Sequence, residues 1–151
     1  MKRSKSAFTM IELVFVILIL GILAVVSIPK LRATRADAKA STLATSIVIG
    51  ATEIASYAVA RGQTESDFSL MSNSIKLLVD SGEAQLGDKN ATISTGTIVD
   101  CVVVSIVRNA TDDILTISFG NPQSDSDCTL LQSLINTEEY PIKLRGASIV
   151  Y

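Results

Sequence analysis

A single acidic residue, Glu12, lies near the start of an otherwise uncharged apolar run, where a carboxylate needs a chemical explanation. The run, Phe8–Ile28, would be roughly 31 Å long as an α-helix, about the hydrocarbon thickness of a bilayer. A carboxylate in hydrocarbon costs about 2–4 kcal/mol even on lenient scales, so it usually has a partner or a function. The run therefore predicts a membrane-spanning helix in which the Glu12 carboxylate has a binding partner or a function.

The residues around Phe8 form a specific pattern. A short basic leader, Met1–Ala7, precedes the sequence FTMIEL, and the apolar run follows. This pattern resembles the signal of prepilins, the precursors of type IV pilins and type II secretion pseudopilins. The resemblance covers Lys2 to about Leu31 and becomes purely architectural beyond that point.

The resemblance implies how the amino terminus is processed. A prepilin peptidase in the inner membrane would cut between Ala7 and Phe8 and methylate the new amino group of Phe8. Glu12 would then be the fifth residue of the mature chain and would act in filament assembly. Ala7 departs from the usual Gly before the cut, which leaves the rate of cleavage in question, although a small residue should still fit a narrow pocket.

Two residues are expected to weaken the apolar helix. Gly21 costs about 1 kcal/mol relative to Ala, and Pro29 lacks an N–H group and crowds the carbonyl of Val25. A kinked transmembrane helix is the simpler interpretation for the isolated subunit. In type IV pilins, a Gly and a Pro at such positions bracket a segment that loses helicity in the filament, and the resemblance implies the same here.

The helix is predicted to continue to Arg61, because Gly62 is the next residue that favours a helix end. One face of residues 29–62 carries apolar residues in steps of three or four: Ala36, Ala40, Leu43, Ile47, Ala51, Ile54 and Ala58. Such an amphipathic half needs a packed domain against it.

Residues 63–151 are predicted to form a small head with an antiparallel sheet. Ser72 or Asn73 can cap a helix over Ser74–Asp80 that ends near Gly82. The fold class is therefore α+β, with a long N-terminal helix packed on a small antiparallel sheet, and the resemblance implies a pilin-like arrangement.

The strands and one further helix of this head can be placed from the sequence pattern. Strands are expected at Ile98–Val107, central or covered on both faces, and at Ile114–Phe119, with Leu115, Ile117 and Phe119 inward. A helix is expected around Thr129–Ile135, and a further strand at Ala147–Tyr151.

Cys101 and Cys128 are the two cysteines of the chain. In a small domain beyond a membrane span they suggest one disulfide, worth roughly 3.5 kcal/mol for a loop of about 27 residues. The alternative is two buried free thiols in a reducing compartment. A disulfide would place the head in the periplasm or outside and the N-terminus in the cytoplasm, whereas basic residues on both sides of the run leave the orientation undecided.

Other chemistry finds little support. The chain has no His, no Cys-x-x-Cys and no phosphate-binding Gly loop, so we expect neither an enzyme nor a cofactor. Asp125 and Asp127 could contact Ca²⁺, but loop solvation and helix capping explain them more simply. Asn90 lies in an N-x-T acceptor with Asp88 two residues before it, a weak indication of glycosylation, and Asn109 lacks such an acid.

Charge and partners complete the expectations. The net charge is −2, and without the leader ten basic residues face fifteen acidic ones, giving −5, which does not indicate a nucleic-acid binder. The expected partners are copies of the chain or related pilins, the prepilin peptidase, an inner-membrane assembly platform with its ATPase, and the lipid bilayer.

Several alternatives to a pilus or secretion subunit stay open. The chain could be a DNA-uptake pseudopilin, or a membrane-anchored periplasmic binding domain that never assembles. An unprocessed anchor, or a secretory signal peptide cut after Ser27, would also begin with basic residues and an apolar run.

Overall fold

The structure of the protein is a computed structural model. It describes the backbone of residues 8–108 and 112–145, and the side chains of all of these except residues 27–33 and 145. Ala7, Asn109 and the strand expected at Ala147–Tyr151 lie outside the described residues. The chain divides into two compact units, an N-terminal unit, Met1–Ala36, and a C-terminal unit, Asp37–Tyr151.

The first helix, α1, covers Met10–Arg61. Its helical assignment runs without a break through Gly21 and Pro29. The helix ends where Gly62 takes a left-handed φ of 69° and donates its N–H to the Ala58 carbonyl, 2.8 Å away. This end agrees with the prediction, because only a residue without a Cβ adopts that φ cheaply.

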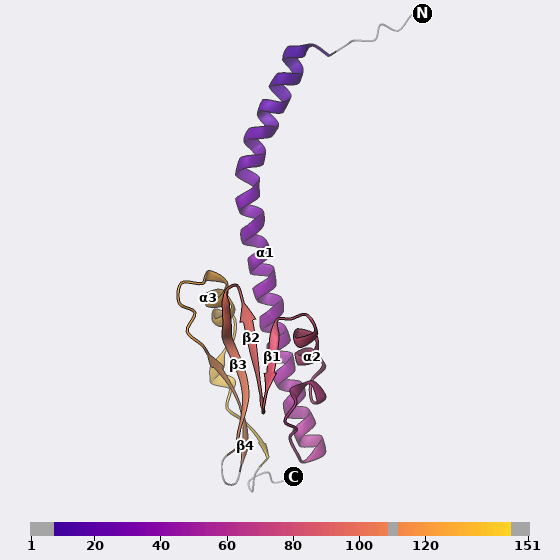
Figure 1. The fold of residues 1–151 in the computed structure, drawn as a ribbon, viewed down its shortest axis with the longest axis vertical. Coiled ribbons are helices and arrows are strands. Elements are labelled where there is room, and N and C mark those ends of the chain that lie inside the picture. Colours follow the sequence, from indigo (N-terminus) through magenta and orange to yellow (C-terminus); the bar gives the residue numbers. More distant parts are fainter. Residues whose placement is uncertain (1–7, 109–111, 146–151) are drawn as a thin grey trace, which may run out of the picture. The chain divides into compact units, whose positions relative to one another are not determined.

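The C-terminal unit contains a five-stranded antiparallel sheet in the order β1-β2-β3-β4-β5 (Figure 1). The strands are β1 Ala84–Gly87, β2 Asn90–Thr95, β3 Ile98–Arg108, β4 Asp113–Phe119 and β5 Ile142–Arg145. Each strand pairs with its neighbour in the sequence, so the sheet is a simple meander. The predicted α+β class, a long N-terminal helix followed by an antiparallel sheet, is confirmed.

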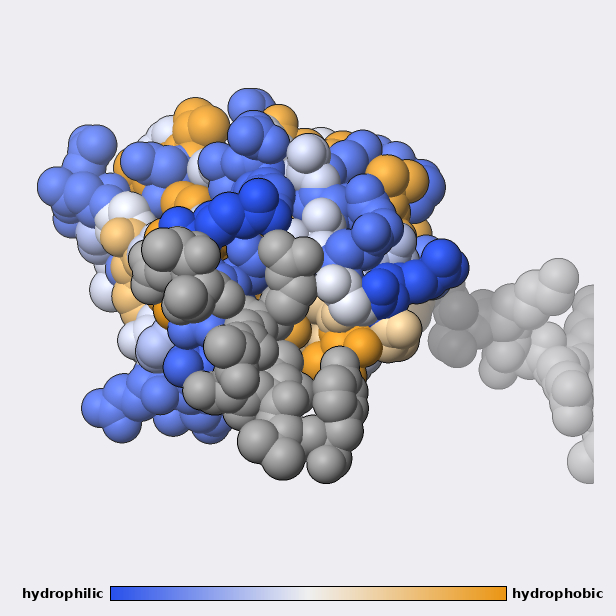
Figure 2. Space-filling view, turned by 90° about the horizontal axis from the view of Figure 1, so that it is seen from below, coloured by the Kyte–Doolittle hydropathy of each residue, from blue (hydrophilic) through white to orange (hydrophobic). Residues whose placement is uncertain are grey.

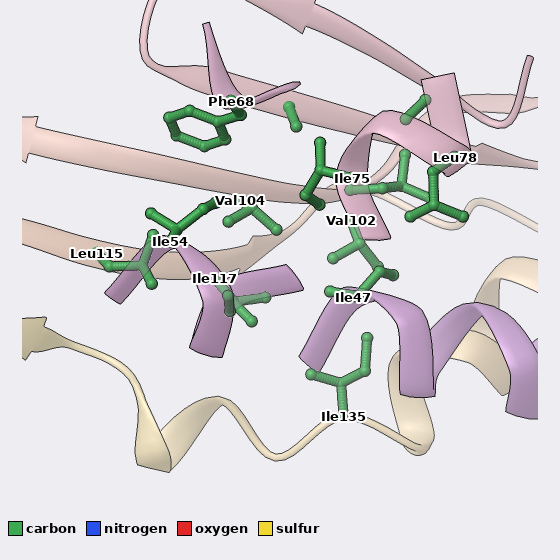
Figure 3. Close-up of a cluster of buried hydrophobic side chains, with 14 of the residues drawn as sticks. Ile47, Ile54, Phe68, Ile75, Leu78, Val102, Val104, Leu115, Ile117 and Ile135 are labelled. Atoms are coloured by element: carbon green, nitrogen blue, oxygen red, sulfur yellow. The ribbon is translucent and has the colours of Figure 1, made fainter. Parts of the chain in front are cut away.

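The part of α1 that lies within the C-terminal unit packs its apolar stripe against one face of the sheet. Ile47 and Ile54 are fully buried and lie among sheet residues such as Val102 and Leu115 (Figure 3). Each large aliphatic side chain buried in this way contributes about 1.5–3 kcal/mol. The predicted stripe is buried from Ala40 to Ala58, and its small residues allow the helix to lie close to the strands.

A short connection follows α1 and leads to a second helix. It contains a 3₁₀ turn, η1 (Phe68–Leu70), and α2 (Asn73–Asp80), whose N-cap is Ser72. The predicted helix begins one residue earlier than expected. Gly50 of α1 lies so close to α2 that a Cβ there would be 2.8 Å from Cγ1 of Ile75, so a glycine permits this contact.

The segment after β4 contains α3 (Ser126–Ser133) and a second 3₁₀ turn, η2 (Thr137–Glu139). The helix begins three residues earlier than the predicted Thr129–Ile135. The reason is Asp125, which caps α3 by accepting hydrogen bonds from the backbone N–H groups of Asp127 and Cys128.

Two details of the predicted sheet differ from the structure. No strand was predicted at β1 or β5, whose four-residue segments carry no strong alternation of their own, nor separately at β2. Of the two alternatives predicted for β3, the structure shows the first: β3 is the central strand of the sheet, and it is not covered on both faces, since Val99 is 56% and Val107 48% exposed. Phe119, expected to point inward, is 40% exposed because β4 ends there.

Candidate functional site

The helix α1 begins with a capping box formed by Thr9 and Glu12. The Thr9 backbone N–H donates to Oε2 of Glu12 at 3.1 Å, and the Thr9 hydroxyl donates to the same oxygen at 2.9 Å. In return, the Glu12 backbone N–H donates to the Thr9 hydroxyl oxygen at 3.3 Å. Two backbone donors that a helix start would otherwise leave unpaired are thereby satisfied.

This arrangement gives Glu12 a local role that the sequence reasoning missed. The T-x-x-E pattern at Thr9–Glu12 was the available signal. A carboxylate in the first turn also interacts favourably with the positive end of the helix dipole. Within the part of the chain that the structure describes, the hydrogen bonds to the Glu12 carboxylate use only Oε2, so Oε1 can accept from a partner outside this chain.

The apolar residues that follow Glu12 lie on the surface of the isolated chain. All side chains of residues 10–26 are exposed, with Phe15 at 62% and Leu20 at 58%. By contrast, the end of the C-terminal unit seen in Figure 2 is mostly hydrophilic with scattered apolar residues. An exposed apolar surface of this length needs lipid or other protein chains around it.

Two segments of α1 are apolar enough to be considered as membrane-contacting helices. Thr34–Arg61 meets the length and composition needed to cross a bilayer, and Met10–Val26 is a shorter apolar helix. Thr34–Arg61 buries its apolar side on the sheet, from Leu43 to Ala58, and therefore serves as a core helix of the C-terminal unit. Met10–Val26 buries no side chain and is the better candidate for contact with lipid.

The other predicted residues of the N-terminal segment are placed only in part. Phe8 is 77% exposed. A Cβ added at Gly21 would meet no atom within 4 Å, so nothing in the isolated chain requires a glycine there. Pro29 lies within the helical backbone of α1. The roles of these residues in cleavage, methylation and helix flexibility remain predictions.

Cys101 of β3 and Cys128 of α3 form a disulfide. Their Cα atoms are 5.6 Å apart, and both residues are fully buried. The predicted pairing is confirmed, and it ties the excursion after β4 to the central strand of the sheet.

The remaining candidate sites have structural partners. Asp125 accepts from Thr97 and from the first turn of α3, and its pKa is lowered, chiefly by the hydrogen bond from the Thr97 backbone. Within the described residues no group of three His, Cys, Asp or Glu side chains could hold a metal ion. Asn90 begins β2 after the turn at Asp88 and Lys89 and is half-buried, and its glycosylation stays a prediction.

One comparison with known proteins identifies the amino-terminal segment. Residues 2–28 match the prokaryotic N-terminal methylation motif. Searches of curated proteins and of solved structures find no match. The matched range contains Ala7, Phe8, Glu12 and Gly21. Residues 2–28 of this chain are therefore a prepilin-type signal, the kind that type IV pilins and pseudopilins carry.

Proposed function

We propose that this protein is a structural subunit of a type IV pilus or of a type II secretion-like pseudopilus. A prepilin peptidase would cut between Ala7 and Phe8 and methylate the Phe8 amine, and the subunit would assemble through Met10–Val26. The observation that carries this proposal is the methylation motif at residues 2–28, combined with an exposed apolar helix that contains a single carboxylate.

The assembly step would use Glu12. In a filament, the Glu12 carboxylate of an incoming subunit would meet the Phe8 ammonium of a neighbour, while its Oε2 stays in the capping box with Thr9. A buried ion pair adds little net stability, but a wrong stagger would leave a charge unpaired in an apolar core. The pair would therefore set the register between subunits more than the strength of their association.

The disulfide supports the proposed orientation in the membrane. Cystines persist in oxidising compartments, so the C-terminal unit would lie in the periplasm or outside the cell and the leader in the cytoplasm. The energy for extraction from the bilayer would come from an ATPase of the assembly platform, because the sequence contains no phosphate-binding loop.

Intact mass spectrometry of the protein purified from the membranes of its own host tests the processing. A chain that starts at Phe8 with one added methyl group is the expected result, and fragmentation of the amino terminus would locate the methyl group. A chain that still starts at Met1 would contradict the proposal. The same spectrum would reveal any glycan, which fragmentation would place on or away from Asn90.

Replacement of Glu12 by Ala tests assembly separately from processing. The variant should still insert into the membrane, but it should enter sheared filaments much less than the wild type, because the Phe8 ammonium of its neighbour would have no partner. Normal filament incorporation would contradict the pairing.

The second candidate function is a membrane-anchored periplasmic binding domain that does not assemble. It requires the same exposed apolar helix but no cleavage, so the mass measurement separates the two. Within the first function, deletion of the gene followed by assays of secretion, surface motility and DNA uptake would distinguish a pseudopilin from a pilin or from a DNA-uptake subunit.

A further inference from the structure

Two polar side chains join α3 to the sheet beside the disulfide. Asp125, the N-cap of α3, and Gln132, in its last turn, reach different parts of the sheet from opposite ends of the helix. We refer to Asp125 and Gln132 as the α3 clamp.

Asp125 connects the start of α3 with the turn that enters β3. Its Oδ1 accepts from the N–H groups of Asp127 and Cys128, both at 3.0 Å. Its Oδ2 accepts from the backbone N–H of Thr97 at 3.0 Å and from the Thr97 hydroxyl at 3.1 Å. The Asp125 carboxylate thus joins Thr97, which lies near Cys101 in the sequence, to the backbone at Cys128.

Gly96 makes this approach possible. It has a left-handed φ of 58°, and a Cβ at this position would overlap the Asp125 carboxylate. The turn between β2 and β3 is therefore shaped to receive the side chain of Asp125.

Gln132 makes the second connection. Its Nε2 donates to the carbonyl of Cys101 at 2.9 Å and to the carbonyl of Gly120 at 3.0 Å, and it lies 3.5 Å from Sγ of Cys128. One amide therefore bridges β3, the end of β4 and the disulfide. Apolar packing adds to it, because Leu131 and Ile135 are buried in the core, with Ile135 beside Ile47 (Figure 3).

We propose that the α3 clamp docks α3 on the sheet without help from the disulfide and presents the two thiols to each other before they are oxidised. The clamp bonds hold the backbone on both sides of the cystine, at Cys101 and at Cys128, whose Cα atoms are 5.6 Å apart, a separation that a disulfide can span. Asp125 and Gln132 are positioning residues for this oxidation, and the disulfide locks a contact that already exists.

The reaction can be followed with glutathione as the oxidant. Cys101 and Cys128 lose two protons and two electrons in total as their S–S bond forms. The S–S bond of oxidised glutathione breaks and takes up the two electrons and two protons, which gives two molecules of reduced glutathione. The equilibrium ratio defines an effective concentration of one thiol at the other.

The first experiment measures this effective concentration in the full-length protein in detergent micelles. Asp125→Ala combined with Gln132→Leu should lower it by roughly tenfold or more, because the helix cap, the two hydrogen bonds from Thr97 to Asp125 and the two from Gln132 to the sheet are lost. Asp127→Ala is the matched control, since it removes a carboxylate from the same turn that makes none of the clamp bonds, and its value should stay within about twofold of the wild type.

Hydrogen exchange of the reduced double variant separates a local effect from a global one. The amides of residues 102–106 in β3 should keep their protection while those of residues 128–134 lose it. An unchanged effective concentration would overturn the proposal, and so would a fall that is accompanied by loss of protection throughout β3.

A second experiment removes the disulfide and keeps the clamp. In the variant Cys101→Ser with Cys128→Ser, the amides of residues 128–134 should remain protected from exchange. Exchange of α3 at the rate of an unfolded chain, or failure of the C-terminal unit to fold, would show that docking depends on the disulfide and would refute the proposal.

Discussion

The hydroxyl of Thr9 donates a hydrogen bond to the carboxylate of Glu12 at 2.9 Å. This bond is part of the capping box at the amino-terminal end of α1. The capping box uses Oε2 of Glu12 only, and the other oxygen is left for the proposed ammonium of a neighbouring subunit. Glu12 therefore combines a role within the chain with a proposed role between chains.

Replacement of Thr9 by Val should weaken the start of α1 while preserving the shape of the side chain. Loss of the cap should cost about 1 kcal/mol locally, so the amides of residues 10–13 should exchange faster in micelles, by roughly fivefold. Hydrogen exchange measured by mass spectrometry would test this.

Thr42→Val is the matched control for this change. The Thr42 hydroxyl donates to the carbonyl of Ala38 within the same helix and does not cap it, so this variant should leave residues 10–13 unchanged. Equal exchange at residues 10–13 in the Thr9 variant and the wild type would show that the capping box contributes nothing to the helix start.

Removal of the disulfide by Cys101→Ser and Cys128→Ser should lower the free energy of unfolding by about 3.5 kcal/mol, according to the chain-entropy model for this loop. The loss arises mainly in the unfolded chain, so the native C-terminal unit should keep its fold. Urea unfolding followed by circular dichroism should show a lower midpoint. An unchanged midpoint would mean that the cystine adds no stability.

Asp113 should make the stability of the C-terminal unit depend on pH. It is 1% exposed and accepts from Arg108 Nε at 2.9 Å and from the Thr64 hydroxyl at 3.1 Å. The hydrogen bond from Arg108 is the largest influence on its pKa, which lies below the ordinary value despite burial. The stabilisation is therefore present above the unfolded pKa of about 3.9 and is lost as the pH falls through the lower folded pKa.

The variant Asp113→Asn tests this directly. It should lower the free energy of unfolding by about 1–3 kcal/mol at pH 7, and the difference from the wild type should shrink as the pH falls below about 4. Asp112→Asn is the control, because Asp112 pairs at 3.4 Å with Lys143, which is largely exposed, and should cost less than about 1 kcal/mol. A pH-independent difference would exclude Asp113 as the titrating group.

Glu53 of α1 should hold the start of α2. Its Oε2 accepts from the Ser72 hydroxyl at 2.6 Å and from the Ser74 backbone N–H at 3.0 Å. Burial raises its pKa, but hydrogen bonds from Ser72, Ser74 and Asn73 outweigh burial and lower the pKa overall. The carboxylate also lies at the positive end of the α2 dipole.

Glu53→Gln should therefore speed the exchange of the amides of residues 73–78, by roughly threefold to tenfold at neutral pH. Asp80→Asn is the comparison within α2, because Asp80 forms an exposed ion pair with Lys76 and does not contact the start of the helix. If both variants exchange like the wild type, the cap from α1 does not stabilise α2.

The sequence could predict those features that depend on one residue type in one local setting. Gly62 and Ser72 marked helix ends correctly because a left-handed φ and an N-cap have strong residue preferences. The stripe of α1 and the inward residues Leu115 and Ile117 of β4 followed from periodicity.

The features that the sequence did not reveal depend on contacts between distant segments. β1 and β5 exist because β2 and β4 offer them edges to pair with, which no four-residue pattern shows. The roles of Glu53 and Asp113 likewise depend on hydrogen bonds. The folded chain places Ser72 next to Glu53 and Arg108 next to Asp113. At Thr9 the T-x-x-E pattern was a local signal for a capping box. It was missed because Glu12 was interpreted only as an acid within an apolar run.

The meander order of the sheet has a consequence for the proposed export of the C-terminal unit across a membrane. Every strand after β1 pairs with the strand made just before it, so no strand depends on a segment that has yet to arrive. A chain that emerges amino-terminal end first can add one strand at a time to its sheet, and each strand can pack on the apolar stripe of α1 that has already emerged. If the C-terminal unit is exported as proposed, little unpaired strand edge would then be exposed to neighbouring chains, which would limit aggregation before assembly.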